Sequence, residues 1–315
     1  MEKPLLKNGE VLKYDSSVKR KTKNVMLSII IISYNTKNML RLCLDSIFRY
    51  PLTLGRFEII IVDNASPDKS GEMVRKRYPQ ITLIQNHRNH GFAYASNQGI
   101  RHSKGEYFLL LNPDTRLLPD ALNTMMYFLM ENQDIGASGG LMMNENGTMQ
   151  PSCLVYPNYF NVFFSRSSVF TKIPFVAKKA RALRSLPDGI TDVDAIAGGY
   201  FYLKREALNQ IGLFDERFFL YVEDIDICKR LKDVGWRVVF NPESKIIHHW
   251  GASSSKMKRK TFWWHHISMF KYFQKHYRSS VLNFTTLMGL VAHYIIWVGT
   301  SFFKEIKNKS NKKKK

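Results

Sequence analysis

Three runs of consecutive apolar residues constrain the fold of this 315-residue chain more than any other feature. They are LSIIIIS from Leu27, FEIIIVD from Phe57 and YFLLL from Tyr107. A strand that is apolar on both faces must be buried on both faces, which is typical of a parallel sheet between layers of helices. Helical patterns at residues 39–47, 67–78 and 92–102 separate these runs and a weaker strand at 81–86. We therefore predict an α/β fold: a doubly wound, mostly parallel sheet with helices on both faces.

The second half of the chain has a less regular pattern. Residues 119–132 predict another helix, and residues 151–191 predict a long variable loop region. The segment VDAIAGGYFYLKRE predicts a strand leading into a helix. Residues 218–236 predict a helix with acids in its first turn, and residues 236–247 predict short strands. Residues 258–278 predict an aromatic, basic helix.

The carboxyl ends of the predicted strands carry polar side chains. These are Ser33, Tyr34 and Asn35 after the first strand, Asp63 and Asn64 at the second, and Asn112, Pro113 and Asp114 after the fourth. Ligands of doubly wound folds bind beyond these ends, so we expect a binding site there. Asp63 is equally compatible with a nucleoside contact and with a turn or helix cap.

Asp114 lies in the segment LNPDT, where a buried strand emerges. A carboxylate in that place can bind Mg²⁺ or Mn²⁺, which accept one or two carboxylates together with substrate phosphates. Asn-Pro-Asp is also a common turn sequence, and residue type alone favours the turn. His248, in the segment HHWGAS, is in the same way compatible with a metal ligand or with a polar loop residue.

Two acids, Glu223 and Asp224, begin a predicted helix. Acids are expected at a helix N-terminus because they interact favourably with the helix dipole. The dipole does not account for the aromatic residues Phe218, Phe219 and Tyr221, which come directly before them. Desolvation by aromatic neighbours raises the pKa of a carboxyl group, and this suits a general base.

Most of the net charge of +21 lies near the C-terminal end, because residues 256–315 contain fourteen basic residues and one acid. Residues 25–255 carry a net charge of only +4. This distribution disfavours a nucleic-acid binder with basic residues over its folded body. Three cysteines without a CxxC motif argue against a disulfide scaffold and against a cysteine zinc site, and favour a reducing compartment. Motifs for dinucleotides (GxGxxG), P-loops and HExxH zinc sites are absent.

The N-terminal segment is charged and has no apolar core, so we expect no cleaved signal peptide and a cytoplasmic start. Near the other end, residues 281–303 form 23 residues without an acid, lysine or arginine. Roughly 20 apolar residues cross a bilayer, but Asn283, His293 and several other polar residues make this stretch only moderately apolar. A buried core helix and a membrane contact both remain open. The lysine-rich flank favours the membrane, with an in-plane or re-entrant helix ahead of a span.

These patterns predict three parts: a polar, basic extension (1–24), a folded domain (25–255) and a C-terminal part (256–315) with the basic helix, the apolar segment and the lysine-rich tail. The folded domain divides into two halves, residues 25–118 and residues 119–255.

The ordered set of motifs resembles glycosyltransferase family 2, and in particular its bacterial rhamnosyltransferase-like members. The segments that carry the resemblance are SIIIISYN, EIIIVDNASPD, NHGFAYASNQGI, YFLLLNPDT, AGGYFYLKRE, FDERFFLYVEDIDICKRLKDVGW and HHWGASS. The resemblance covers about residues 26–275. It implies a GT-A fold, a nucleoside-diphosphate-sugar donor, Mg²⁺ or Mn²⁺ as cofactor, and inversion at the anomeric carbon. It also implies that residues 25–255 are the catalytic domain, with a nucleotide-sugar half (25–118) and an acceptor half (119–255).

The resemblance also assigns expected roles to residues. The nucleoside would be held by Ser33, Tyr34, Asn35 and Asp63, and the donor loop would be shaped by Asn89, Gly91, Phe92 and Asn97. The donor site would be completed by Asn112 and Asp114, and the metal would be held by Asp114 and His248. Asp224 would be the catalytic base, and Gly198, Gly199, Glu223, Arg230 and Trp236 would form the acceptor side. The family's DxD motif is Asn-Pro-Asp here, so Asp114 is the one carboxylate that this motif supplies.

We therefore expect an inverting glycosyltransferase that transfers L-rhamnose from dTDP-L-rhamnose to a lipid-linked or cell-surface polysaccharide acceptor. It would act at the cytoplasmic face of the cell membrane, on an anionic surface, with no nucleic acid as partner. The alternatives are the same chemistry with a UDP-hexose, or a catalytically silent module of this fold that binds a membrane or a nucleic acid. The absence of the QxxRW motif sets the chain apart from processive synthases.

Overall fold

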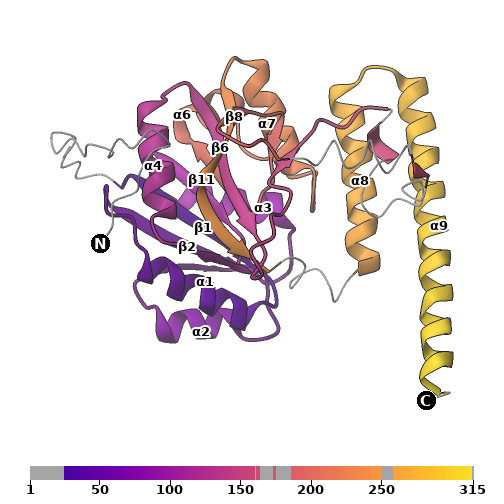
Figure 1. The fold of residues 1–315 in the computed structure, drawn as a ribbon, viewed down its shortest axis with the longest axis horizontal. Coiled ribbons are helices and arrows are strands. Elements are labelled where there is room, and N and C mark those ends of the chain that lie inside the picture. The colour runs from indigo at the N-terminus through magenta and orange to yellow at the C-terminus, as the bar shows by residue number, and fades with distance from the viewer. Residues whose placement is uncertain (1–24, 160, 164–172, 175–185, 250–257, 314–315) are drawn as a thin grey trace.

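The computed structural model describes residues 25–159, 161–163, 173–174, 186–249 and 258–313. The expected N-terminal extension, residues 1–24, lies outside these residues, as does much of the loosely patterned region after residue 159. The described part of the chain forms an α/β domain with a central sheet between helices, followed by a hairpin of two long helices (Figure 1).

The first half of the sheet has the expected parallel arrangement, with strand order β3-β2-β1-β4. Its elements are β1 (Leu27–Ser33), α1 (Lys37–Arg49), β2 (Phe57–Asp63), α2 (Ser70–Arg77), β3 (Thr82–Gln85), α3 (Phe92–His102) and β4 (Tyr107–Leu111). All of β1 is buried, and its residues alternate between two hydrophobic clusters. Ile29 and Ile31 belong to one cluster and Ile30 and Ile32 to the other, as a strand buried on both faces requires.

The second half of the sheet mixes strand directions. It contains β5 (Thr115–Leu117), α4 (Ala121–Glu131), β6 (Ile135–Met143), β7 (Cys153–Leu154), the short 3₁₀ helix Asn161–Phe163, β8 (Thr191–Asp192), β9 (Ala195–Ile196), β10 (Tyr200–Lys204), α6 (Arg205–Ile211), α7 (Glu223–Asp233) and β11 (Arg237–His248). β10 runs antiparallel between β4 and β6, and β11 lies parallel to β6. The short strands expected over residues 236–247 are one twelve-residue strand, β11, with an irregularity between Asn241 and Lys245.

The sequence did not reveal β6, although it is a central strand. Its sequence, IGASGGLMM, is rich in glycine and therefore lacks the side chains that show a strand period. The structure requires these glycines: a Cβ at Gly139 would lie 2.2 Å from the Ile196 side chain, and a Cβ at Gly140 would lie 2.2 Å from the Ser244 carbonyl oxygen. Close packing requires glycine at these positions, so the strand lacks the larger side chains whose alternation would reveal it in the sequence.

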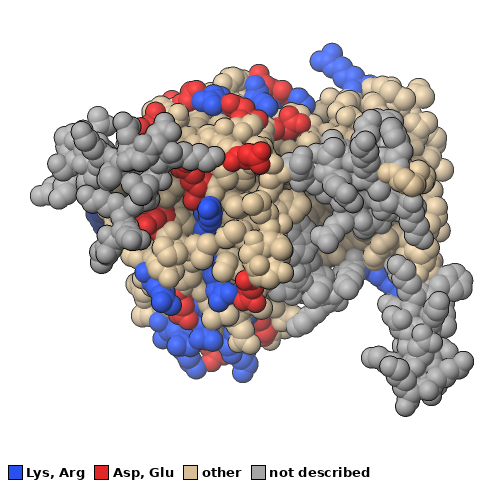
Figure 2. All heavy atoms as spheres, in the orientation of Figure 1, with Lys and Arg blue, Asp and Glu red and all other residues tan. Residues whose placement is uncertain are grey.

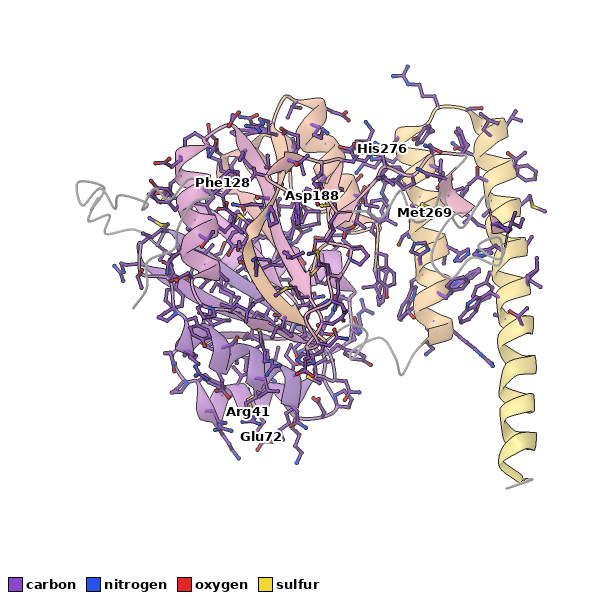
Figure 3. All side chains as sticks on the ribbon, in the orientation of Figure 1. Arg41, Glu72, Phe128, Asp188, Met269 and His276 are labelled. Atoms are coloured by element: carbon purple, nitrogen blue, oxygen red, sulfur yellow. The ribbon has the colours of Figure 1, made fainter. Side chains whose placement is uncertain are left out.

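The C-terminal hairpin consists of α8 (Lys258–His276) and α9 (Ser280–Lys313), which lie side by side (Figure 1). α9 includes the expected apolar segment, and Ser280–Thr300 is long and apolar enough, by length and composition, to cross a membrane. His276 lies at the C-terminal end of α8, on the side that faces the catalytic domain (Figure 3). Its Nε2 atom is 2.8 Å from Oδ1 of Asp226 in α7, so the hairpin is joined to the domain by a polar contact.

Candidate active site

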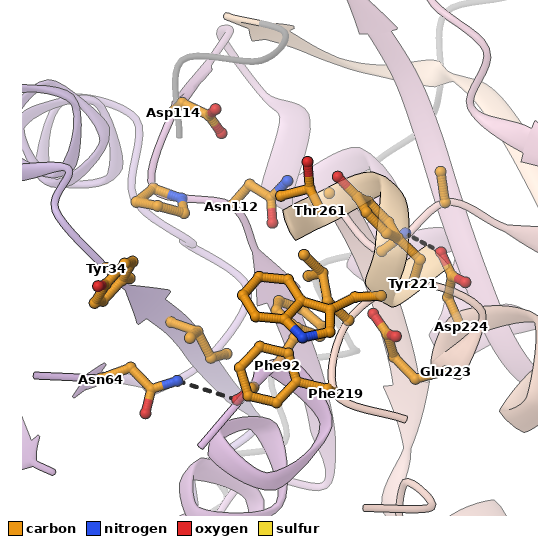
Figure 4. Close-up of a pocket in the computed structure, with 18 of the residues that line it drawn as sticks. Tyr34, Asn64, Phe92, Asn112, Asp114, Phe219, Tyr221, Glu223, Asp224 and Thr261 are labelled. Atoms are coloured by element: carbon orange, nitrogen blue, oxygen red, sulfur yellow. Dashed lines mark hydrogen bonds between the residues drawn. The ribbon is translucent and has the colours of Figure 1, made fainter. Parts of the chain in front are cut away.

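A cavity of about 420 Å³ lies at the carboxyl ends of β1 and β4, where the sequence predicts a ligand site. Residues from opposite sides of the domain line it (Figure 4): Tyr34, Asn64 and Asp114 on one side, and Glu223, Asp224 and Tyr221 on the other. Many of the expected site residues take part in the lining. These are Tyr34, Asn89, Gly91, Phe92, Asn112, Asp114, Gly198, Gly199, Glu223, Asp224 and His248.

Three residues expected at the nucleoside end lie behind the cavity wall. The Ser33 hydroxyl is 3.1 Å from the Thr36 hydroxyl, and the Asn35 backbone N–H donates to Ser66 Oγ at 3.0 Å. Asp63 is buried and accepts a hydrogen bond from the Ser66 backbone N–H at 3.2 Å. These contacts hold together the loops that follow β1 and β2, so the structure places the three residues as supports of the lining.

Three further expected residues pack away from the cavity. Asn97 exchanges hydrogen bonds with the backbone of Phe214, at 2.9 and 3.0 Å. The Arg230 guanidinium donates to Asp226 and to backbone carbonyls of residues 211–213. The Trp236 indole N–H donates to Gln210 Oε1 at 3.0 Å. Each of these side chains hydrogen-bonds to neighbouring turns and lies outside the cavity lining, so the expected roles of Asn97 in the donor loop and of Arg230 and Trp236 on the acceptor side stay predictions.

Asn64 is a lining residue to which the sequence assigned no separate role. Its amide group donates to Asn89 Oδ1 at 2.9 Å and to the Gly91 carbonyl at 3.1 Å, and its oxygen accepts from the His90 backbone N–H at 3.1 Å. A buried amide with this many partners has one orientation. Asn64 therefore fixes the loop that leads into α3. Its position directly after the second apolar run was the available sequence signal.

Gly91 joins the two sides of the cavity. Its φ angle is +88°, and a Cβ at this position would lie 2.4 Å from the Phe219 carbonyl oxygen. The same carbonyl accepts a hydrogen bond of 2.7 Å from the Phe92 backbone N–H. A side chain at residue 91 would separate these two segments, so the contact requires glycine.

Asp224 is positioned by backbone donors on its own side of the cavity. Its Oδ2 atom accepts a hydrogen bond of 3.0 Å from the Gly198 N–H, and Oδ1 accepts one of 2.9 Å from the Ile225 N–H. Burial raises the pKa of Asp224 to about 6, although these hydrogen bonds act in the opposite direction. A carboxylate with such a pKa is ionised at neutral pH and still basic enough to accept a proton.

The neighbouring Glu223 has a different environment. Burial and the charge of Asp224 raise the pKa of Glu223 well above its ordinary value. Its Oε2 atom has no hydrogen-bond partner among the described residues. Tyr221 and Val222, directly before it, have φ angles of +67° and +73°, which are unfavourable for these side chains. Backbone strain of this kind is typical of functional sites, where surrounding packing maintains it.

Asp114 and His248 meet at the other side of the cavity, with 3.3 Å between Asp114 Oδ1 and His248 Nε2. Gln150 is buried and orients the imidazole: its amide N–H₂ donates to the His248 carbonyl and to Asn144 Oδ1, both at 2.7 Å. Its oxygen, 2.7 Å from His248 Nδ1, therefore accepts the ring N–H, which leaves the lone pair on Nε2. No sequence motif points to Gln150, because it lies in a loop remote from His248 along the chain.

The donor set at this point is small. Among the residues that the structure describes, no group of three or more His, Cys, Asp or Glu side chains could hold a metal ion. A carboxylate and an imidazole lone pair fit a divalent cation that takes its other ligands from water and from a diphosphate. The residues present thus fit a shared site for metal and substrate, and not a closed structural site.

Comparison with known proteins places the chain in a family. The model of glycosyl transferase family 2 matches residues 28–185, and that of glycosyl transferase family group 2 matches residues 107–303. The N-acetylglucosaminyl-diphospho-decaprenol L-rhamnosyltransferase of Mycobacterium tuberculosis is 25% identical over 225 residues, 67% of this chain and 73% of that protein. The rhamnosyltransferase WbbL of Escherichia coli is 25% identical over 275 residues, 84% of this chain and 99% of that protein.

Solved structures show the same fold. The mannosyltransferase PcManGT of Pyrobaculum calidifontis, in complex with GDP-Man and Mn²⁺, matches with a TM-score of 0.55 at 20% identity, over 87% of this chain and 70% of that chain. Residues 1–349 of S. aureus TarS match with a TM-score of 0.52 at 15% identity, over 89% of this chain and 74% of that chain. Since the sheet has the GT-A arrangement and a family model matches half of the residues, this chain belongs to glycosyl transferase family 2 and is a rhamnosyltransferase-like glycosyltransferase.

Proposed function

We propose that this glycosyltransferase transfers L-rhamnose from dTDP-L-rhamnose to a lipid-linked saccharide, with inversion of the anomeric carbon. The observation that carries the proposal is Asp224, a carboxylate that lines the cavity, is aligned by the Gly198 N–H and has a pKa of about 6. The sugar and the acceptor class rest on the relatives, two of which are rhamnosyltransferases, one of them named for a diphospho-decaprenol acceptor.

The donor would lie along the side of the cavity formed by the strand ends. Tyr34 and Phe92 offer aromatic surface for the base and sugar, and Asn89 and Asn112 offer amide groups. Ser33, Asn35 and Asp63 support this side from behind, and Asn64 holds the loop of Asn89 and Gly91 in place.

Asp114 and His248 would hold a Mg²⁺ or Mn²⁺ ion beside the diphosphate, with Gln150 keeping the His248 lone pair directed at the ion. Such an ion, when bound, offsets the negative charge that grows on the leaving nucleotide. The family fold supports this assignment, since a structure with this fold binds Mn²⁺ together with its nucleotide sugar.

In the reaction, an acceptor hydroxyl oxygen forms a bond to the anomeric carbon while the bond from that carbon to the diphosphate oxygen breaks. Asp224 takes the hydroxyl proton. Because the acceptor attacks the face opposite the diphosphate, a single displacement inverts the anomeric carbon and needs no covalent enzyme intermediate. Gly198, Gly199 and Glu223 would form the acceptor side. Thr261 and Trp264 of α8, which also line the cavity, extend that side beyond the expected domain boundary at residue 255.

We further place the protein at the cytoplasmic face of the cell membrane, where a polyprenyl-linked acceptor is presented. The apolar segment of α9 supports a location at the membrane.

The test is a panel of nucleotide sugars with a polyprenyl-diphosphate-linked acceptor, in Mn²⁺, in Mg²⁺ and in EDTA. We expect transfer from dTDP-L-rhamnose, loss of transfer in EDTA, and an inverted linkage by NMR. Transfer from a UDP-hexose only would reject rhamnose and keep the mechanism. Full activity in EDTA would reject the metal, and no transfer from any donor would favour the silent module.

A further inference from the structure

Helix α9 has two faces of different character. Thr286, Leu290 and His293 are buried, and their spacing puts them on one face, against α8. The opposite face carries a stripe of apolar residues, Val281, Phe284, Met288, Val291 and Ile295, which we call the exposed stripe. Phe284 is 62% exposed and Ile295 is 63% exposed. A continuous apolar stripe left in water is unusual for a protein without a partner on that surface.

The buried face of α9 is held by polar contacts as well as by packing. His293 Nδ1 lies 3.0 Å from His266 Nε2 in α8, and the Asn283 amide donates to the Tyr277 carbonyl at 2.9 Å. The Tyr159 hydroxyl donates to Asn283 Oδ1 at 2.9 Å. Moving α9 into lipid, away from α8 and the domain, would separate His293 from His266 and Asn283 from Tyr159, at a cost for each contact.

Helix α8 is in turn tied to the catalytic domain. Lys275 Nζ lies 2.7 Å from Asp226 Oδ1 and 2.8 Å from Asp215 Oδ2, and Asp226 is fully buried in α7. Lys271 Nζ donates to the Arg217 carbonyl at 2.6 Å. A helix fixed in this way cannot follow α9 across a bilayer, because Lys271 and Lys275 would enter the hydrocarbon with it or lose these partners.

The charge beside the stripe is complementary to anionic lipid. Seven lysines and one acid follow between residues 304 and 315, directly after the apolar segment. Where grey atoms do not cover the hairpin, Figure 2 shows a mostly uncharged surface with basic side chains at its upper and lower ends. Trp263, exposed on α8, packs against Tyr294 of α9 with 5.0 Å between ring centroids. Apolar, aromatic and basic residues in this combination are typical of a helix that lies in the membrane interface.

We propose that α9 lies in the plane of the membrane surface, with the exposed stripe in the lipid and the lysine-rich tail on anionic headgroups, and that it does not span the bilayer. Helix α8 then links the membrane to the site, because Trp263 is exposed beside α9 while Thr261 and Trp264 line the cavity. A lipid-linked acceptor in the same leaflet would reach Asp224 past α8. This last step rests on the proposed function, whereas the membrane contact does not.

The first experiment measures binding of the full chain to vesicles of phosphatidylcholine with and without phosphatidylglycerol. We expect binding that requires the anionic lipid and that falls about tenfold or more in Phe284→Glu and in Ile295→Glu. The matched control is Ile190→Glu, at an exposed isoleucine of the catalytic domain, which should bind as the unaltered protein does. Unchanged binding of the two stripe variants would overturn the proposal. So would stripe variants that lose self-association and keep vesicle binding, since the stripe would then join two copies.

The second experiment determines which side of the membrane the tail occupies. A protease-cleavable tag after Lys315 should be digested in inverted membrane vesicles, where the catalytic domain is also accessible. A tag protected there and digested in spheroplasts would show a span and overturn the in-plane arrangement. Transfer to a water-soluble acceptor analogue should survive in Ile295→Glu. If the stripe variants lose vesicle binding, and neither they nor the unaltered protein transfers sugar, the proposed function is wrong and the membrane contact is confirmed.

Discussion

The two sides of the cavity are built in different ways (Figure 4). The proposed donor side comes from residues that directly follow parallel strands, such as Tyr34, Asn64 and Asn112, so the position of each is determined by the strand that it follows. The proposed acceptor side is assembled from distant segments: Asp224 accepts a hydrogen bond from Gly198, Phe219 accepts one from Phe92, and Trp264 comes from the hairpin. The strand-end residues are thus specified by local sequence, whereas the opposite side depends on long-range contacts, as does the pairing of His248 with Gln150 beside Asp114. We expect substitutions on the two sides to have different effects. Changes on the donor side should weaken binding of nucleotide or metal, and changes on the acceptor side should lower the rate of transfer.

The strongest test of this difference is Asp224→Asn, which removes the proposed base and keeps the side-chain shape. We expect transfer to fall by about 10²–10⁴, as for the loss of a general base, while the affinity for dTDP, measured by calorimetry, stays the same. Asp233→Asn, at an exposed acid of the same helix, is the control. Turnover close to that of the unaltered enzyme would remove Asp224 from the mechanism.

Gly91→Ala should break the junction between the two sides. The added methyl group meets the Phe219 carbonyl at a φ angle of +88°, so we expect a loss of stability of about 2–3 kcal/mol. Thermal or urea unfolding measures it. Gly189→Ala is the matched control, because a Cβ there has open space around it. Equal stability of the two variants would show that the segments move apart at little cost.

Gln150→Met tests whether Mn²⁺ binding on the donor side requires the His248 ring to be oriented by Gln150. Loss of the acceptor for the His248 N–H should weaken Mn²⁺ binding about 10–100-fold. Gln150→Glu keeps that acceptor and should restore most of the affinity. Mn²⁺ titration followed by electron paramagnetic resonance measures binding, and ¹⁵N chemical shifts of His248 report its tautomer. If Gln150→Met binds Mn²⁺ as tightly as the unaltered protein does, Mn²⁺ affinity does not depend on the orientation of His248 by Gln150.

The acceptor side should also determine the pH dependence. Burial raises the pKa of Asp224 to about 6, and the base must be deprotonated to act. We therefore expect kcat/KM to be level above pH 7 and to fall about tenfold for each pH unit below 6. The residual activity of Asp224→Asn should not show this limb. A fall that persists in the variant would belong to another group.

The smallest effect is expected for Trp236→Phe. Trp236 contacts Gln210 and lies outside the cavity lining, so KM for donor and acceptor should change less than about twofold, and stability should fall by about 1 kcal/mol for the lost hydrogen bond. Steady-state kinetics with both substrates measures this. A large rise in the acceptor KM would return Trp236 to the acceptor side.

Much of the donor half could be predicted because its signals are local. Continuous apolar runs specify buried strands, and the polar residues at their ends reach the same edge of a parallel sheet. Helix α3 begins and ends where its pattern predicts, at Phe92 and His102. The contacts of Asn97, Arg230 and Trp236 with neighbouring turns could not be predicted in this way, because a residue type does not reveal its hydrogen-bond partners.

The sequence by itself determined the α/β class, the family and the strand-end position of the candidate site, since these depend on periodicity and on residues close together along the chain. Only the tertiary structure decided that a glycine-rich strand, β6, completes the sheet, that Gln150 orients His248, and that α8 forms a wall of the cavity. Each of these depends on contacts between residues far apart in the sequence. Such contacts arise from close packing and from the pairing of buried polar groups, which leave no period along the chain.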